Sequence, residues 1–190
     1  MTRRFSGGPA TEVIVELCDL ARRAPSAGYS QGTHFLLLAD SDRDAFFTVS
    51  GAGSWFEKTS PGVIGCSHIV LVLADPDAYT DRYSESDKSE HGLGERDAWF
   101  VPYWLTDAAM AAQNLLLLAE DRGLGALFFG LHGDPRATLK HFGVPDRVQT
   151  IGAIALGLRA PDDQVTGSPT RRGRRARDAV VHLGRWTNPE

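Results

Sequence analysis

The arginines at the two ends of the chain are the side chains whose type and spacing best suit binding of a charged ligand. Arg3 and Arg4 stand near the start, and a second group near the end holds Arg171, Arg172, Arg174, Arg175 and Arg177. Guanidinium groups bind phosphate through paired hydrogen bonds, so the two groups would suit an anionic cofactor if they meet in space. The alternative is a solvated basic tail, and the residues alone leave both interpretations open.

The other reactive residues form no pattern that would support metal or nucleophilic catalysis. The six histidines show neither HxxxH nor HxH spacing, and no cluster of carboxylates and cysteines supplies metal ligands, so we expect no metal site. A G-x-S-x-G elbow and a phosphate-binding loop are also absent. The glycines at 123 and 125 follow an expected helix, whereas a dinucleotide fingerprint must follow a strand. An enzyme of this kind needs a bound cofactor to supply the reactive atom.

Composition limits the class of protein. The 190 residues are 42% hydrophobic and 23% charged, which is typical of one globular domain over residues 1–190. The formal net charge is −4, so we expect no binding to nucleic acid or membrane, although the basic tail alone would suit nucleic acid. Cys18 and Cys66 lie far apart in apolar surroundings, which indicates a reducing compartment. We see no signal peptide and no apolar stretch long enough to span a bilayer, and therefore expect a cytoplasmic protein.

Apolar periodicity and turn residues predict an α+β fold. A first helix is expected over residues 11–24 with Thr11 as its cap. The strongest helix covers residues 105–122 and should be buried, because it is apolar almost all round. Asp134 followed by Pro135 predicts another capped helix, which stops at Gly143. The remaining expected elements are a helix at 42–49 and strands at 34–39, 68–74, 150–157 and 180–183.

Residues 76–103 differ from the rest of the chain, since aspartate, serine, glutamate and glycine alternate there with aromatic residues. We interpret this segment as a lid over a flat ligand, with a solvated surface loop as the alternative. It is called the lid segment below. The side chains expected to face a substrate are Tyr83, Trp99, Tyr103 and Trp104. For Tyr103 and Trp104, packing in the core is the alternative.

Five segments, in chain order, resemble the nitroreductase family. Residues 24–31 read Ala-Pro-Ser-Ala-Gly-Tyr-Ser-Gln and resemble the family signature A-P-S-x-x-N-x-Q-P-W; they are called the signature loop below. Residues 3–6 resemble the end of the segment R-R-S-x-R-x-F. Residues 107–126 look like the family's central helix and glycine exit, and residues 142–157 like a later strand. The basic run before Val180 stands where the family places phosphate-binding residues. The patterns S-A-G-[FY]-S-Q-G and V-P-Y-W are similar to a subgroup of actinobacterial members.

The resemblance implies an intertwined homodimer with a central mixed or antiparallel sheet, flanking helices and a long buried central helix. Each of its two FMN sites would be built from both chains. Cofactor binding would involve Arg3, Arg172 and Arg174 at the phosphate; Pro25, Ser26, Ala27, Tyr29 and Gln31 of the signature loop, supplied by the partner; and Phe129 and Gly130 at the flavin ring. His132 is the one histidine whose position in the sequence would bring it near that ring. No side chain is assigned as a catalytic acid or base, and Tyr29 is the only candidate, with a shape-determining wall as its alternative.

Three positions depart from the family pattern. Its first Arg-Arg-Ser would fall at or before Met1. Either part of the grip on phosphate is missing, which would weaken FMN binding, or the natural chain starts earlier. Tyr29 takes the place of the usual asparagine, and Gly32-Thr33 replaces Pro-Trp. Both changes alter the surroundings of the ring.

The function implied by the resemblance is an FMN-dependent oxidoreductase. It would pass hydride from NAD(P)H through the flavin to a nitroaromatic, quinone or similar flat acceptor by a ping-pong mechanism. Two alternatives stay open. One is a flavin dehydrogenase or oxidase that acts on a biosynthetic intermediate, and the other is a non-catalytic flavin-binding or storage protein.

Overall fold

The computed structural model describes residues 1–164 and 167–186, which are built around one antiparallel sheet. Its described strands follow the order β1-β2-β4-β3. Their bounds are β1 (Thr33–Ala39), β2 (His68–Ala74), β3 (Leu124–Phe129) and β4 (Gln149–Leu158). His68 of β2 pairs with Ala39 of β1 on one side and with Leu156 of β4 on the other. The predicted α+β class is confirmed, as are three of the predicted strands.

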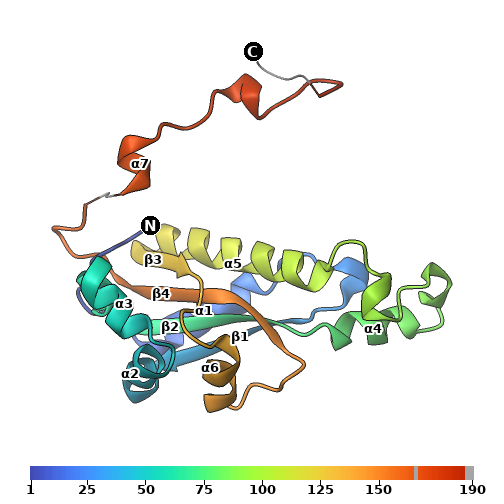
Figure 1. Ribbon diagram of the computed structural model, residues 1–190, viewed down its shortest axis with the longest axis horizontal. Coiled ribbons are helices and arrows are strands. Elements are labelled where there is room, and N and C mark those ends of the chain that lie inside the picture. The colour runs from blue at the N-terminus through green and yellow to red at the C-terminus, as the bar shows by residue number, and fades with distance from the viewer. Residues whose placement is uncertain (165–166, 187–190) are drawn as a thin grey trace.

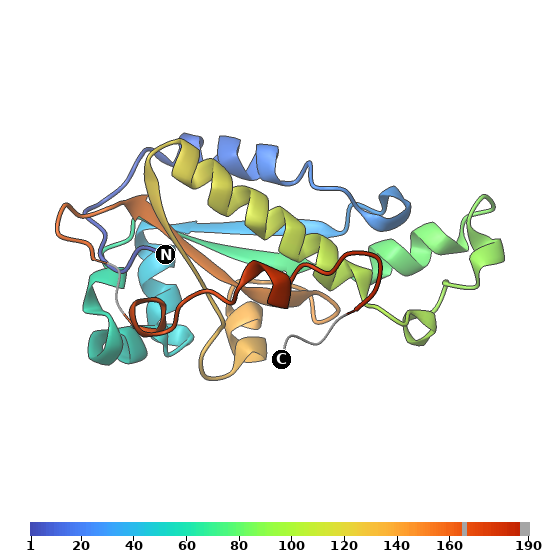
Figure 2. The same cartoon turned by 90° about the horizontal axis from the view of Figure 1, so that it is seen from above.

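Helices cover both faces of this sheet and give three layers (Figure 1, Figure 2). One face carries α1 (Thr11–Ala21) and α5 (Tyr103–Asp121), and the other carries α2 (Asp40–Val49), α3 (Ala52–Thr59) and α6 (Pro135–His141). Along β2, Val70 and Val72 pack toward α1 and α5, whereas Ile69 and Leu71 pack toward α2 and α3. Successive side chains of a strand point to opposite faces, so this strand is buried on both sides and reads as one apolar run.

The lid segment contains more regular structure than the sequence indicates. It begins with α4 (Asp77–Ser84) and continues through two short turns, η3 (Ser89–His91) and η4 (Arg96–Ala98). These elements project from one end of the sheet (Figure 2). Two more 3-10 turns, η1 (Ala27–Tyr29) and η2 (Pro61–Val63), lie in the connections before β1 and β2.

Several predicted elements need correction. Thr11 is the first residue of α1 and not its cap; its hydroxyl contacts His68, and the helix ends at Ala21 instead of residue 24. Both α3 and β3 are additional to the predicted elements. The cap at Asp134 is confirmed, because its carboxylate accepts the backbone N–H groups of Arg136 and Ala137.

The predicted strand at residues 180–183 is wrong for this chain. Residues 167–186 form an arm that leaves the body, with only a short helix, α7 (Ser168–Arg171), and a 3-10 turn, η5 (Arg177–Ala179) (Figure 1). Val180 and Val181 are more than half exposed. A strand needs a neighbour for its backbone hydrogen bonds, and no described strand pairs with this part of the arm. The last residues of the arm, 187–190, lie outside the described part of the chain.

The central helix α5 is buried on one side only. Ala108, Ala111, Ala112 and Leu115 face the sheet and α1, as predicted. However, Met110 and Leu117 keep 40% and 60% of their surface exposed, so the expectation of a helix buried all round does not hold within one chain. An exposed leucine on the longest helix leaves an apolar surface uncovered.

His68 joins the sheet to the start of α1. Its Nδ1 lies 2.8 Å from the Ser67 hydroxyl, and its Nε2 lies 3.1 Å from the hydroxyl of Thr11. Burial lowers the pKa of His68 below its ordinary value of 6.5; Asp40 acts in the opposite direction and Arg43 in the same one. The folded protein therefore holds this imidazole neutral at a pH where the unfolded chain protonates it.

We predict that this histidine makes stability fall with acidification. Because the pKa is lowered on folding, its contribution is complete above about pH 6.5 and is lost as the pH falls below that value. The free energy of unfolding, measured with urea at about pH 8 and at about pH 5.5, should differ less between the two pH values for His68→Gln than for the wild type. An equal difference in both proteins would assign the pH dependence to other groups.

Candidate functional site

The signature loop is folded into a tight, partly left-handed turn. The φ angles of Gly28, Tyr29 and Gln31 are 59°, 59° and 55°. Glycine adopts such angles readily, whereas each of the other two residues costs roughly 1 kcal/mol or more. Inside the loop, Gln31 N–H donates to the Ser26 hydroxyl at 3.0 Å, and the Ser30 hydroxyl donates to Ala27 O at 2.7 Å. Contacts from outside the loop must offset the remaining strain.

The buried carboxylate of Asp107, in the first turns of α5, provides one of these contacts. Only 3% of its surface is exposed. It accepts the Ala27 N–H at 2.9 Å and the Tyr79 hydroxyl at 2.8 Å, and the Thr106 hydroxyl donates to its second oxygen at 3.2 Å. Burial, and the hydrogen bond to Asp107, raise the pKa of Tyr79 above its usual value. This one side chain joins α5, α4 and the signature loop.

The aromatic residues of the lid segment form a cluster around Tyr79. Trp99 and Trp104 are nearly buried and meet the Tyr79 ring edge-on at 6.0 and 6.2 Å between centroids. Their indole N–H groups donate to Leu93 O and to the Gln149 side chain. Both indoles therefore pack in the core. For Trp104 this is the core packing already considered, whereas Trp99 was expected to face a substrate and anchors the lid segment instead. Tyr103 is half exposed and Tyr83 lies against the signature loop, while Phe100 is fully exposed.

A cleft of about 420 Å³ opens at the opposite end of the molecule, beside the N-terminal arginines. It is called the arginine cleft below. It is lined by Arg3, Arg4, Thr59, Ser60, Pro61, Gly62, Asp162, Asp163 and Gln164. The backbone N–H groups of Arg3 and Arg4 both donate to Asp163 at 2.9 Å, and Arg4 pairs with Asp162 at 3.3 Å. Asp163 thereby fixes the start of the arm next to Arg3.

The second wall of this cleft, formed by residues 59–62, was not among the predicted site residues. Residues 59–62 were recognisable as a turn from Ser60, Pro61 and Gly62, but nothing in the sequence indicates that they meet Arg3. Gly62 is required there, because a Cβ would lie 2.8 Å from Arg3 O and 2.6 Å from the Arg4 side chain. The close approach of two backbones thus fixes the shape of the cleft.

Phe129 and Gly130 lie at the end of β3. The Phe129 ring meets Phe56 and Phe46 edge-on, at 5.1 and 6.2 Å between centroids. A Cβ on Gly130 would meet nothing within 4 Å, so the backbone there is open to a ligand. Next to it, His132 stacks on Trp55 at 4.4 Å with an interplanar angle of 22°. Trp55 stands 42% exposed and was not among the predicted site residues.

The predicted cofactor residues do not meet within one chain. Figure 1 places the signature loop near α4, at one end of the molecule, and the N-terminus near α3, at the other. Tyr29 and Gln31 are exposed, the former by 76%. Arg172 and Arg174 are exposed on the arm, and in the described part of the chain neither makes an ion pair. The signature loop and the arginine cleft are therefore separate within one chain, and the two are called the half-sites of the predicted cofactor site below.

The described part of the chain holds neither a metal-binding cluster nor a membrane-spanning helix. Within residues 1–164 and 167–186, there is no group of three or more histidine, cysteine, aspartate or glutamate side chains that could hold a metal ion. No helix in the same ranges combines the length and apolar character needed to cross a bilayer.

Comparison with known proteins gives these half-sites a family context. Residues 2–158 match the sequence model described as the Nitroreductase family. A relative from Staphylococcus aureus (strain bovine RF122 / ET3-1), named NADPH-dependent oxidoreductase, is 25% identical over 172 residues. That match covers 88% of this chain but 64% of the relative, so the chain spans less than two thirds of that protein's length. The resemblance expected from the residues is confirmed.

Solved structures share the fold at low sequence identity. The nitroreductase family protein from Streptococcus pneumoniae TIGR4 has a TM-score of 0.71 and 19% identity, with 95% of this chain and 94% of that chain covered. Nitroreductase CinD from Lactococcus lactis, in complex with chloramphenicol, has a TM-score of 0.66 and 16% identity, with 93% and 94% covered. NfrA1 from B. megaterium has a TM-score of 0.70 and 20% identity, with 98% and 71% covered.

We predict that Asp107→Ala destabilises the protein by about 2–4 kcal/mol, because it leaves the Ala27 N–H and the Tyr79 hydroxyl without an acceptor. Tyr79→Phe, which removes one donor and leaves the carboxylate, should cost about 1 kcal/mol. Urea unfolding measures both. Thr138→Val is the control, since this buried hydroxyl donates to the carbonyl of Asp134, the cap of α6, and lies outside the signature loop.

Limited proteolysis separates the loop from global stability in the same variants. Asp107→Ala should expose residues 24–31 to cleavage, and Thr138→Val should not. If the unfolding free energy of Asp107→Ala lies within about 0.5 kcal/mol of the wild-type value, the carboxylate does not stabilise the loop and the Tyr79 cluster as described.

Proposed function

The chain belongs to the nitroreductase family, and on that premise we propose that it is an FMN-dependent oxidoreductase. It passes hydride from NAD(P)H by way of the flavin to a nitroaromatic, quinone or similar flat acceptor in a ping-pong reaction. The relative named NADPH-dependent oxidoreductase supports the donor. The acceptor class is supported by CinD, whose solved complexes hold chloramphenicol and 4-nitrophenol.

The arginine cleft is the observation that carries this proposal. Its volume of about 420 Å³ lies in the range of small-molecule sites. Asp162 and Asp163 are engaged by Arg4 and by backbone N–H groups, and among the described residues Arg3 makes no ion pair. The arm starts at the rim of the cleft, and Arg172 follows Asp163 by nine residues. These residues fit a phosphorylated cofactor, with Arg3, Arg172 and Arg174 on the phosphate.

A homodimer completes the site. The signature loop and the arginine cleft lie at opposite ends of one chain, so a ligand that needs both must take them from two copies. The exposed face of α5 around Met110 and Leu117 offers an apolar surface for the second copy. The arm carries Val180, Val181 and Leu183 exposed, which suits a segment that packs on a neighbour. We therefore assign Pro25, Ser26 and Ala27 of the partner subunit to the flavin.

The residues of this chain would hold and shield the cofactor. Bound FMN supplies the centre that accepts and donates hydride. Gly130 keeps the backbone at the end of β3 accessible, and Phe129 is held in place by Phe46 and Phe56. Tyr29, exposed at the tip of the signature loop, forms one wall of the flavin site and sets its shape. Tyr83, Tyr103 and Phe100 of the lid segment limit access of water and select a flat acceptor.

An absorption spectrum of the purified protein, followed by anaerobic addition of NADH or NADPH, tests the proposal. We expect FMN to bind and its visible absorption to bleach with either nucleotide, then to return on addition of benzoquinone. Bound flavin that neither nucleotide reduces would favour a dehydrogenase with its own substrate, or a storage protein. Failure to bind added FMN would contradict the proposal.

We predict that Arg172→Ala with Arg174→Ala weakens FMN binding by about 100-fold, because two charge-assisted phosphate contacts are lost. Fluorescence titration gives the dissociation constant, and circular dichroism should report an unchanged fold. Arg171→Ala with Arg175→Ala is the matched control, since it removes the same charge from the same arm. Equal affinity in the two double variants would contradict the phosphate assignment.

A further inference from the structure

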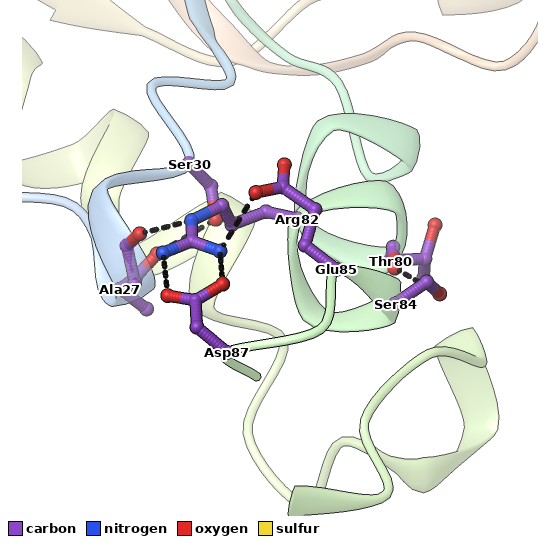
Figure 3. A network of polar contacts seen from close by, with 8 residues as sticks. Ala27, Ser30, Thr80, Arg82, Ser84, Glu85 and Asp87 are labelled. Atoms are coloured by element: carbon purple, nitrogen blue, oxygen red, sulfur yellow. Dashed lines mark hydrogen bonds and ion pairs between the residues drawn. The ribbon is translucent and has the colours of Figure 1, made fainter. Parts of the chain in front are cut away.

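Arg82 of α4 connects the lid segment to the signature loop (Figure 3). Its Nε donates to Gly28 O at 2.9 Å. Its two terminal nitrogens donate to both oxygens of Asp87 at 2.7 Å, and one of them also donates to Glu85 at 3.0 Å. One guanidinium thus holds a loop carbonyl and, at the same time, the turn that follows α4.

The loop carbonyl held by Arg82 belongs to the most constrained part of the signature loop. Gly28 begins the left-handed stretch that continues in Tyr29, and the Tyr83 ring lies directly against it. A Cβ on Gly28 would lie 2.6 Å from that ring. Asp107 holds the adjacent Ala27 N–H from the other side. The peptide units of the turn are therefore fixed between α5 and α4.

We propose that Arg82 is a positioning residue that couples the conformation of the lid segment to the shape of the signature loop, and through the loop to the flavin of the neighbouring subunit. The inference rests on the proposed function, since it assigns the loop to a flavin site. An acceptor that contacts the lid segment would thereby affect the fit of the loop to flavin, and bound flavin would in turn affect the affinity for the acceptor.

The chemistry of the contact requires arginine. Its planar guanidinium presents donors in a fixed fork, so it serves Asp87 with two parallel hydrogen bonds and still directs Nε to Gly28. A lysine ammonium keeps the charge but offers a single nitrogen, which cannot reach the acceptor atoms of Gly28, Glu85 and Asp87 together. The hydrogen bonds from Arg82 lower the pKa of Asp87 to about 2, so this carboxylate stays ionised at any working pH.

A second ion pair in the lid segment supplies a control. Arg96, in η4, pairs with Asp77 at the start of α4. This pair also joins the later part of the lid segment to α4, but it makes no contact with the signature loop among the described residues. Replacing Arg96 by lysine therefore makes the same chemical change in the lid segment at a guanidinium that does not touch the signature loop.

The experiment compares Arg82→Lys, Asp87→Asn and Arg96→Lys with the wild type. Hydrogen exchange of residues 27–31 in flavin-free protein reports loop order, and fluorescence titration reports the dissociation constant of FMN. The absorption maximum of FMN at saturation reports the surroundings of the ring. Steady-state kinetics with NADPH and benzoquinone then separates KM from kcat.

We expect Arg82→Lys to speed exchange in the loop, to raise the FMN dissociation constant and the KM for benzoquinone by about tenfold, and to shift the absorption maximum. Asp87 itself touches no atom of the loop, so Asp87→Asn should change loop exchange, FMN affinity and KM in the same direction but by a smaller amount. Arg96→Lys should leave the loop and FMN affinity unchanged. Asp87→Asn alters only an exposed carboxylate and keeps the test decisive if Arg82→Lys fails to fold.

The proposal is overturned if Arg82→Lys matches Arg96→Lys, or if exchange rises in residues 76–103 while residues 27–31 keep wild-type protection. Failure of the proposed function is distinguishable, because wild-type protein would then bind no FMN, whereas the exchange comparison would still decide the coupling.

Discussion

A carboxylate removed from water must find hydrogen-bond donors within the protein, and this constraint at Asp107 organises the candidate site. Its donors come from the Ala27 backbone, the Tyr79 hydroxyl and the Thr106 hydroxyl. The Ala27 contact fixes a loop whose left-handed residues would otherwise favour other conformations. The Tyr79 contact buries a ring on which Trp99 and Trp104 then pack. The lid segment and the signature loop thus share one anchor at the start of α5.

The sheet and α5 keep the two half-sites apart while fixing both. The first turns of α5 hold the signature loop, and the helix runs to the other end of the sheet, where Gly123 turns the chain into β3. The end of β3 carries Phe129 and Gly130. Beside the sheet, Asp163 joins the N-terminal arginines to the root of the arm. A rigid spacer between two incomplete sites suits a protein that completes each site with a second copy.

The sequence determined the elements well where a local pattern decides them. The apolar run of β2 and the cap at Asp134 depend on residues next to one another, and both were predicted. Contacts across long distances were not. Asp107 looks like an ordinary acidic residue near a helix start, and no pattern shows that it faces Ala27, 80 residues away. Arg82 and Gly28 are 54 residues apart, and their contact is equally hidden.

The predictions that failed also concern positions that contacts between distant parts of the chain decide. Trp99 was expected to face a ligand because aromatic residues in a polar segment suit one, yet burial around Tyr79 decides its position. For Trp104, the interpretation as a core residue holds. Residues 180–183 have the composition of a strand, but a strand also needs a neighbour. The N-terminal arginines stood out by residue type, and the signature loop was recognised through the family resemblance. Their separation within one chain depends on topology, which residue types alone do not reveal.

Subunit complementation tests the central claim that each site combines two chains. One variant carries Arg3→Ala, Arg172→Ala and Arg174→Ala, and the other carries Gly28→Val, which places a side chain against Tyr83. Each homodimer should bind little FMN. After the two are unfolded and refolded together in equal amounts, half of the dimers should be mixed and contain one intact site, so about one quarter of all sites should bind FMN with wild-type affinity. No recovery on mixing would contradict a site shared between chains, as would tight FMN binding by either variant alone.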